Sequence, residues 1–137
     1  MKATIQHINP EGMIKSPAFS QAVITSGTGK TIYIGGQNAI DADGQLVGKG
    51  NIQEQTVQVM KNIETALTAC GATFDHVVSL SIFLVQGQDA ASGFQAARPF
   101  MAKASHPPVV TVLFVAALGN PDYLVEINAT AFAPGGL

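Results

Sequence analysis

The chain has 137 residues, of which 47% are hydrophobic and only 12% are charged, and its formal net charge is −2. A chain of this length fits one domain, 1–137, and can bury about two thirds of its unfolded surface. The charged share is about half the roughly 25% of an average soluble domain. We therefore expect a second subunit to cover part of the apolar surface. The cations are scattered, which argues against partners such as nucleic acid or an anionic membrane.

The number of cysteines and the length of the apolar segments indicate the cellular compartment of the protein. The single cysteine, Cys70, has no partner for an internal disulfide, which suits a reducing cytoplasm. The N-terminal residues contain no apolar stretch typical of a secretion signal. No segment reaches the roughly 18 apolar residues of a membrane span. These features predict a cytoplasmic protein.

The N-terminal third is rich in short β-prone runs. Strands are predicted over residues 3–8, 20–26 and 31–37. The GTGK segment between the last two is interpreted as a hairpin turn, because Gly27 and Gly29 can adopt positive φ. DADGQ at 41–45 indicates a further turn.

From Asn51 the apolar residues recur at a helical period. Asn51 and Glu54 resemble a capping box, and Gly71 is suited to follow the last turn. The apolar stripe of this helix consists of Val59, Ile63, Ala66 and Cys70, with Met60 and Leu67 beside it. Its position on the stripe predicts Cys70 to be a small core residue and not a nucleophile.

The C-terminal half alternates strands with a second helix. Strands are predicted over 76–85, 109–118 and 123–132. The second helix has its stripe at Phe94, Ala97, Met101 and Ala104, and Pro107 and Pro108 are expected to end it. The order of elements is βββαβαββ, and two helices are expected to pack on one face of a sheet.

The strand predicted at 109–118 is apolar on both faces, with Thr111 as its only polar side chain. Packed helices explain one apolar face. The other face must also be covered, most simply by a sheet of a neighbouring subunit.

Several motifs resemble known ligand sites but lack residues at the spacing that those sites require. GTGKT at 27–31 lacks the first glycine of a phosphate-binding loop, and DADG lacks the closing glutamate of a calcium loop. The three histidines are too dispersed to suggest a metal site, so no metal is expected. Two candidates for a functional site remain. One is the polar face of the last strand, which carries Glu126, and the other is the pair Gly35–Gly36, where a ligand can approach the backbone closely.

Five segments resemble the RidA/YjgF family in order and spacing, over roughly residues 10–133. They are SPAFSQAV (16–23), IGGQ (34–37), the helix and strand of 53–85, HPPVVTVLFVAAL (106–118) and YLVEINATAF (123–132). The resemblance implies a chorismate-mutase-like α+β fold, with two helices on one face of a mixed, mostly antiparallel sheet. It also implies a homotrimer with a barrel-like core and small-molecule clefts between subunits, and no cofactor.

Many members of this family hydrolyse enamines and imines released by pyridoxal-phosphate enzymes, giving a 2-keto acid and ammonia. The chemistry needs a cation for the substrate carboxylate and an acidic residue that directs water. By its place in VEI, Glu126 matches the acidic residue. The family arginine of a motif like PPVRT is replaced by Val110 in PPVVT. The resemblance therefore implies weak or absent activity on 2-imino carboxylates.

Other pocket positions also depart from the family pattern. Phe19 replaces a tyrosine, Gly35 a serine, Phe94 an amide and Val112 a cysteine. The implied substrate-binding residues are Phe19, Gly35, Gly36, Gln37, Phe94, Val110, Thr111 and Val112. Arg98, the only arginine, is either a solvated helical residue or a replacement for the missing cation.

Two hypotheses remain open at this point. The first is a divergent deaminase-type hydrolase that acts on a small, less anionic nitrogen compound, with Glu126 as base. The second is a non-catalytic trimer that binds a small apolar ligand or a partner protein in the same cleft, with Glu126 as an ordinary polar residue on a partly wet strand. A ribonuclease activity finds no support in a chain without a basic stripe.

Overall fold

The computed structural model describes residues 2–135, and its elements follow the predicted order. The bounds are β1 Thr4–Ile8, β2 Ala22–Ser26, β3 Gly29–Gln37, α1 Ile52–Ala69, η1 Phe74–His76, β4 Val77–Val85, α2 Ala90–Met101, β5 Val109–Val115 and β6 Val125–Pro134. The α+β class is confirmed, and the 3-10 turn η1 is the one addition to the order βββαβαββ.

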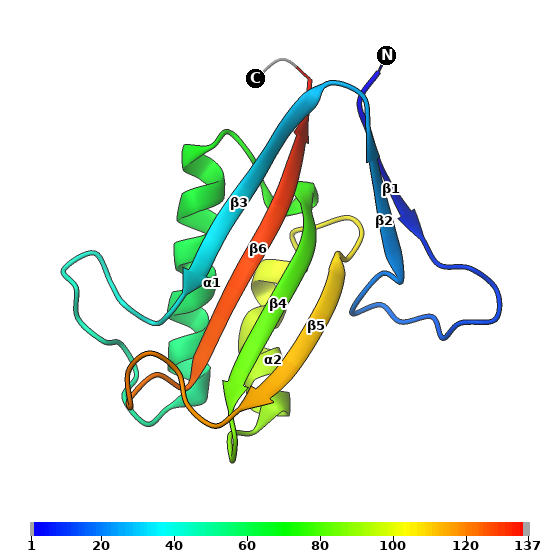
Figure 1. The fold of residues 1–137 in the computed structure, drawn as a ribbon. Helices are drawn as coiled ribbons and strands as arrows, with labels where there is room; N and C mark the ends of the chain where they lie inside the picture. Colours follow the sequence, from blue (N-terminus) through cyan, green and yellow to red (C-terminus); the bar gives the residue numbers. More distant parts are fainter. Residues whose placement is uncertain (1, 136–137) are drawn as a thin grey trace.

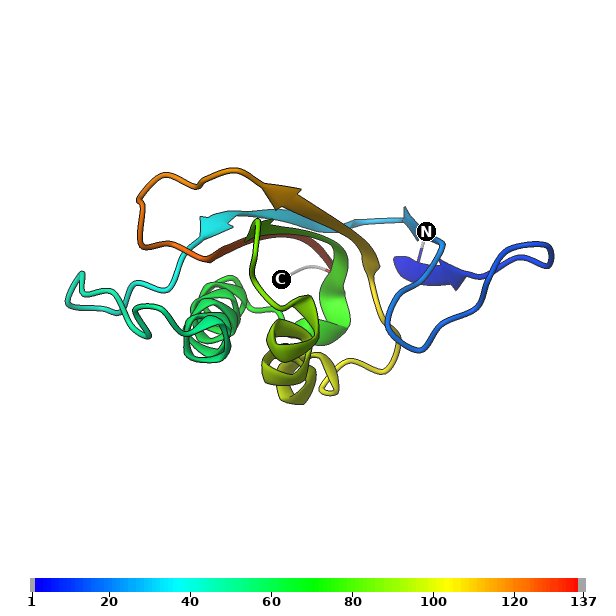
Figure 2. The ribbon, with the colours of Figure 1, turned by 90° about the horizontal axis from the view of Figure 1, so that it is seen from below.

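Four strands form the main sheet in the order β3-β6-β4-β5, which is antiparallel except for the parallel pair β4–β5. Both helices lie on one face of this sheet, as predicted (Figure 2). α1 runs behind β3 and β6, while α2 runs behind β4 and β5 (Figure 1). Because side chains alternate along β6, Val125 and Ile127 are buried beneath the helices and Glu126 lies on the other face. We call that second face the outer face.

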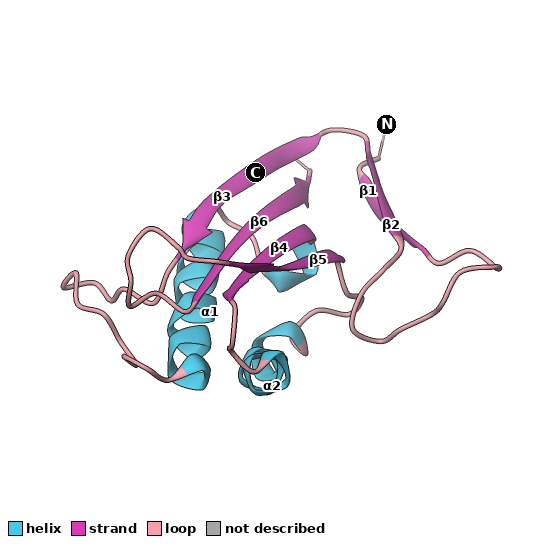
Figure 3. Ribbon diagram, turned by 60° about the horizontal axis from the view of Figure 1, so that its bottom comes forward, coloured by secondary structure: helices cyan, strands magenta, loops and turns pink. Residues whose placement is uncertain are grey.

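The hairpin predicted between β2 and β3 is wrong. β2 pairs with β1 in a separate two-stranded sheet that extends beyond β5, and β3 pairs with β6 (Figure 3). Gly27 does take a positive φ of 86°, but Gly29 does not, and it packs against the ring of Phe132 on β6. Turn residues predict only that the chain changes direction. The strand with which β3 pairs depends on β6, which is distant in sequence and whose alternation of buried and exposed side chains matches that of β3.

The first helix begins and ends as predicted, but its buried apolar stripe ends before Cys70. The Asn51 side chain accepts a hydrogen bond from the Glu54 amide at 3.0 Å, and Gly71 follows the helix with φ 75°. Val59 and Ile63 are buried, whereas Cys70 is exposed. The prediction of Cys70 as a core residue is wrong, because the cap residue Cys70 lies past the last helical turn.

The second helix ends at Met101, before Ala104 and the two prolines that were expected to stop it. Pro99 lies in its last turn and has no amide to donate to the Gln95 carbonyl, which weakens this end of the helix. Gly93 is the only buried residue within α2, which packs more closely on α1 than on the sheet. Neither helix within residues 2–135 is long and apolar enough to cross a membrane.

Candidate functional site

A cavity of about 420 Å³ lies between α2 and the sheet. Its floor is made of the helix-facing side chains of β4, β5 and β6, which include Leu80, Ile82, Val110, Val112 and Ile127. Along α2 it is lined by Ala90, Gly93, Phe94, Ala97, Arg98 and Met101. Arg98 is the only charged residue among the described residues that line it.

The sequence of α2 explains why this space is open. The positions of α2 that face the cavity include Ala90, Gly93 and Ala97, which are short and fill little of the space between the helix and the sheet. On α1 the corresponding layer contains Met60 and Ile63, which are almost completely buried. Interiors pack to a constant density only where side chains can fill the space between elements. The cavity therefore follows from the small residues of α2.

The N-terminal arm closes one end of the cavity. Pro17 and Ala18 line it, and the arm is held there by hydrogen bonds to the segment before β5. The Ser20 hydroxyl donates to the Pro107 carbonyl at 2.5 Å, and the Ser20 amide donates to the Pro108 carbonyl at 2.9 Å. His7 reinforces this contact, since its Nδ1 lies 3.0 Å from the same Pro107 carbonyl.

Glu126 is the second residue of β6, a central strand of the sheet, and it lies on the outer face. Its Oε1 accepts a hydrogen bond from Asn38 Nδ2 at 3.3 Å. Gly36 lies directly against the carboxylate, so that a Cβ at this position would overlap it. The neighbouring residues in register are Phe83 on β4 and Leu113 on β5. No described cation forms an ion pair with Glu126, so its carboxylate has lone pairs free for a further donor.

The structure divides the predicted site residues into two groups. Phe94, Val110 and Val112 come together at the cavity. The second group, Gly35, Gly36, Gln37 and Glu126, lies where β3 meets β6. Of the other two, Thr111 is exposed on β5, and Phe19 is half-buried in the N-terminal arm without lining the cavity.

Strand register keeps the two groups apart within one chain. Val110 pairs with Leu80, which pairs with Ala129, so these residues point toward the helices. Glu126 belongs to the alternate set, which points to the outer face. A single chain therefore does not place the carboxylate beside the apolar group. Sequence reasoning also missed Asn38, the hydrogen-bond donor to Glu126, for which the only signal was its place directly after Gln37.

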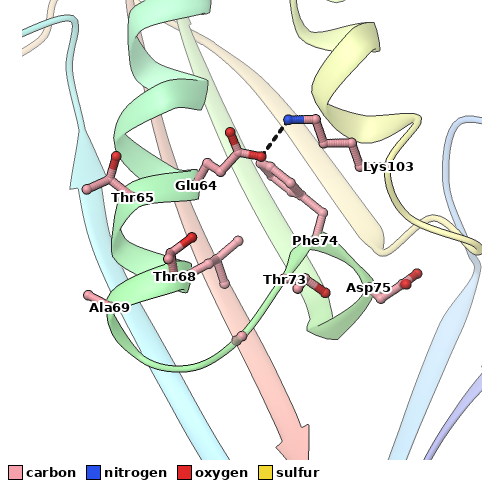
Figure 4. Close-up of a pocket in the computed structure, with 10 residues that line it drawn as sticks. Glu64, Thr65, Thr68, Ala69, Thr73, Phe74, Asp75 and Lys103 are labelled. Atoms are coloured by element: carbon pink, nitrogen blue, oxygen red, sulfur yellow. Dashed lines mark hydrogen bonds and ion pairs between the residues drawn. The ribbon is translucent and has the colours of Figure 1, made fainter.

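A second, wider groove of about 740 Å³ lies between the end of α1, η1 and Lys103 (Figure 4). It contains none of the predicted site residues, and several of its side chains are exposed. Lys103 Nζ pairs with Glu64 Oε2 at 2.6 Å, and Asp75 accepts from the Ser105 amide at 2.6 Å. The Ser105 amide holds the pKa of Asp75 below its ordinary value. The charged groups of this groove are therefore already partnered.

The same fold occurs in proteins of known structure. The structure is similar to that of YyfB, a protein of the conserved Rid family from Yersinia pestis, with a TM-score of 0.83 and 37% identity over 93% of this chain and 97% of that one. The family described as endoribonuclease L-PSP matches residues 13–133. The chain therefore belongs to the Rid/YjgF family, also described as endoribonuclease L-PSP, and the resemblance seen in the sequence is confirmed.

Two curated relatives differ in how much of the chain they share. A RutC family protein of Pyrococcus abyssi is 30% identical over 114 residues, which is 83% of this chain and 85% of that protein. The 2-iminobutanoate/2-iminopropanoate deaminase of Rattus norvegicus is 38% identical over 73 residues, which is 53% of this chain and 50% of that protein.

Proposed function

We propose that this protein is a deaminase-type hydrolase for small, weakly anionic enamines, imines or related nitrogen compounds. Glu126 carries the proposal. Its carboxylate is fixed by Asn38 and by contact with Gly36, and it has no ionic partner among the described residues. A fixed carboxylate with free lone pairs can accept a proton from a water molecule as that water attacks an imine carbon.

The proposed site needs a second copy of the chain. The outer face of the sheet is exposed in one chain, with Tyr33 81% and Leu113 48% accessible. We propose that in a homotrimer Glu126 of one subunit lies beside the cavity of the next, which is lined by Phe94, Val110 and Val112. This arrangement would give the carboxylate an apolar wall, in an inter-subunit cleft of the kind that the family resemblance implies.

The apolar wall limits the substrates that we propose. An arginine at position 110 would bind a substrate carboxylate through two charge-assisted hydrogen bonds, each worth roughly 1.5–3 kcal/mol. Val110 provides none. We therefore expect this protein to accelerate hydrolysis of 2-iminobutanoate by less than about a hundredth of the acceleration by an arginine-bearing relative. The imine is generated from threonine with a dehydratase and trapped with semicarbazide.

The same assay tests whether another residue takes the place of the arginine that the family has at position 110. Acceleration equal to that of the relative would contradict the proposal and would indicate that another cation, with Arg98 as the first candidate, binds the carboxylate. Val110→Arg alone should restore little activity, because Phe19, Gly35 and Phe94 also depart from the family pattern. Full recovery from this one substitution would show that the pocket has diverged less than we propose.

Glu126→Gln tests the base directly. The substitution keeps the shape of the side chain and its oxygen acceptor for Asn38 but removes the basic carboxylate. We expect any hydrolytic activity to fall at least about a hundredfold, since general bases contribute roughly 10²–10⁴. Size and thermal stability of the assembly should not change. Unchanged turnover in Glu126→Gln would exclude Glu126 as the base.

Leu113→Asp tests the assembly. Leu113 is half exposed in the single chain, so a carboxylate there should not disturb the fold of one subunit. In a packed subunit interface an unpaired charge costs several kcal/mol. We expect wild type to elute with the light-scattering mass of a trimer of 14.2 kDa chains, and the variant to dissociate. A monomeric wild-type protein would contradict the shared site.

A second candidate function is supported by the cavity. Its volume of about 420 Å³ and almost wholly apolar lining suit a small apolar or amphipathic ligand. Under this alternative the trimer binds a ligand without catalysis. A protein that binds such a ligand but hydrolyses no imine, and is unaffected by Glu126→Gln, would favour the second candidate.

A further inference from the structure

We infer that Asn62 of α1 is a positioning residue for Glu126 and acts on it through Asn38. The inference rests on the proposed function, because it concerns the residue that we propose as the base. A chain of hydrogen bonds carries it, which runs from α1 on the helix side of the sheet to the carboxylate on the outer face.

Asn38 sets the direction of the carboxylate. Its Nδ2 group has two hydrogens to donate, and it lies 3.3 Å from Glu126 Oε1 and 3.3 Å from the Val125 carbonyl oxygen. The two acceptors belong to consecutive residues of β6, so one amide group links the side chain of the base to the backbone beside it. Turning the Asn38 side chain away would break both bonds at once. The place of Asn38 therefore decides which way the carboxylate points.

The sheet itself does not hold Asn38, because β3 ends at Gln37. Asn62 holds it instead, since its Nδ2 donates to the Asn38 carbonyl at 3.1 Å and to the Ile40 carbonyl at 2.9 Å. Ala39, between these two carbonyls, is fully buried and anchors the turn to the core. We therefore expect a change at Asn62 to shift the turn without unfolding it.

The place of Asn62 within α1 also points to this role. Asparagine is less favourable in a helix interior than glutamine or lysine, because its short side chain competes for backbone groups. Asn62 nevertheless lies well inside α1, and its Oδ1 accepts a hydrogen bond from Gln58 Nε2, one turn earlier, at 2.8 Å. Gln58 thereby fixes the orientation in which both hydrogens of Asn62 point at the turn after β3. Supporting bonds of this kind keep a reactive group within the small deviations that catalysis tolerates.

NMR spectroscopy of the intact protein tests the inference, with the side-chain amide signal of Asn38 as the probe. Glu126→Gln replaces a charged acceptor with a neutral one. It should shift this signal in the wild-type background, because charge-assisted hydrogen bonds are shorter and stronger. Asn62→Asp keeps the shape of the side chain but replaces the donating amide with an oxygen that faces two carbonyl oxygens. In the Asn62→Asp background the Asn38 signal should move, and its response to Glu126→Gln should be lost.

Gln53→Glu is the matched control. It makes the same change from carboxamide to carboxylate on α1, at an exposed side chain outside this chain of bonds, and should leave the Asn38 signal and its response as in wild type. If Asn62→Asp does not fold, Asn62→Ala removes both donors without adding a charge. The inference is overturned if Glu126→Gln leaves the Asn38 signal unmoved in the wild-type background. It is also overturned if the response survives in the Asn62 variants or is lost in Gln53→Glu.

Turnover gives a second readout that a loss of stability alone would not move. Asn62→Asp should lower kcat for 2-iminobutanoate about tenfold and leave KM unchanged, since a displaced base costs rate and not binding. If Glu126→Gln abolishes turnover and Asn62→Asp does not lower kcat, the inference is overturned. Unchanged turnover in Glu126→Gln would instead overturn the proposed function, while the Asn38 signal would still report whether Asn62 controls the carboxylate. The two failures are therefore distinguishable.

Discussion

The two helices cover the same sheet in different ways. α1 buries seven residues of its own, among them Val59, Met60, Ile63 and Leu67, and packs on β3 and β6. α2 buries only Gly93 and leaves the cavity above β4 and β5. The difference lies in side-chain size at the inward positions, because glycine and alanine cannot fill the space that leucine and methionine fill.

This difference separates the functions that we propose for the two halves. The closely packed half holds β6 in place, and with it the Glu126 carboxylate on the outer face. The loosely packed half keeps an apolar space that a ligand can enter.

The largest expected effect comes from truncating a side chain beneath α1. Ile63 is fully buried, and Ile63→Ala should lower the free energy of unfolding by about 2–5 kcal/mol. Ile82→Ala is the same change beneath α2, at a half-buried residue that lines the cavity. It should cost less, about 1–2 kcal/mol, since Ile82 has fewer packing partners to lose. Urea unfolding at one fixed protein concentration measures both, and equal losses would show that the two halves are equally well packed.

A smaller effect is expected where β3 meets β6. Gly36→Ala should displace the Glu126 carboxylate and break its hydrogen bond with Asn38, at a cost of about 1–3 kcal/mol. Gly35→Ala is the control, since a Cβ there has no atom within 4 Å and the φ of Gly35 is not positive. It should be neutral or slightly stabilising. The two midpoints of urea unfolding should therefore differ, and a neutral Gly36→Ala would mean that the carboxylate is not held by this contact.

The smallest effect concerns the loosely packed half, where Asp75 of η1 binds the Ser105 amide between α2 and β5. This bond lowers the pKa of Asp75 in the folded state. A carboxyl whose pKa is lowered by folding stabilises the protein above its unfolded pKa of about 3.9 and loses this contribution as the pH falls through the folded value.

Asp75→Asn should therefore destabilise the protein at pH 7, by no more than about 1 kcal/mol because the residue is exposed. The difference from wild type should narrow as the pH is lowered from 6 toward 3, measured by thermal unfolding. Asp43→Asn, in an exposed turn, is the control. A difference that stays constant with pH would show that the bond to Ser105 does not favour the charged carboxylate.

Local patterns in the sequence determined much of the secondary structure of this protein. Period and capping residues predicted a helix between Asn51 and Gly71, and the pattern of the last strand predicted a polar face with Glu126. The family resemblance, confirmed by comparison, was also present in the sequence. These features were predictable because each depends on residues that are near neighbours along the chain.

The tertiary structure alone decided the rest. β3 pairs with β6 and not with β2, because pairing depends on a strand far away in the sequence. Cys70 lies outside the core, because the stripe ends with the last helical turn. Register places Val110 and Glu126 on opposite faces, and the cavity arises because α2 presents small residues to strands distant in sequence. Each of these depends on how separate elements meet in space, which the local period of a sequence does not specify.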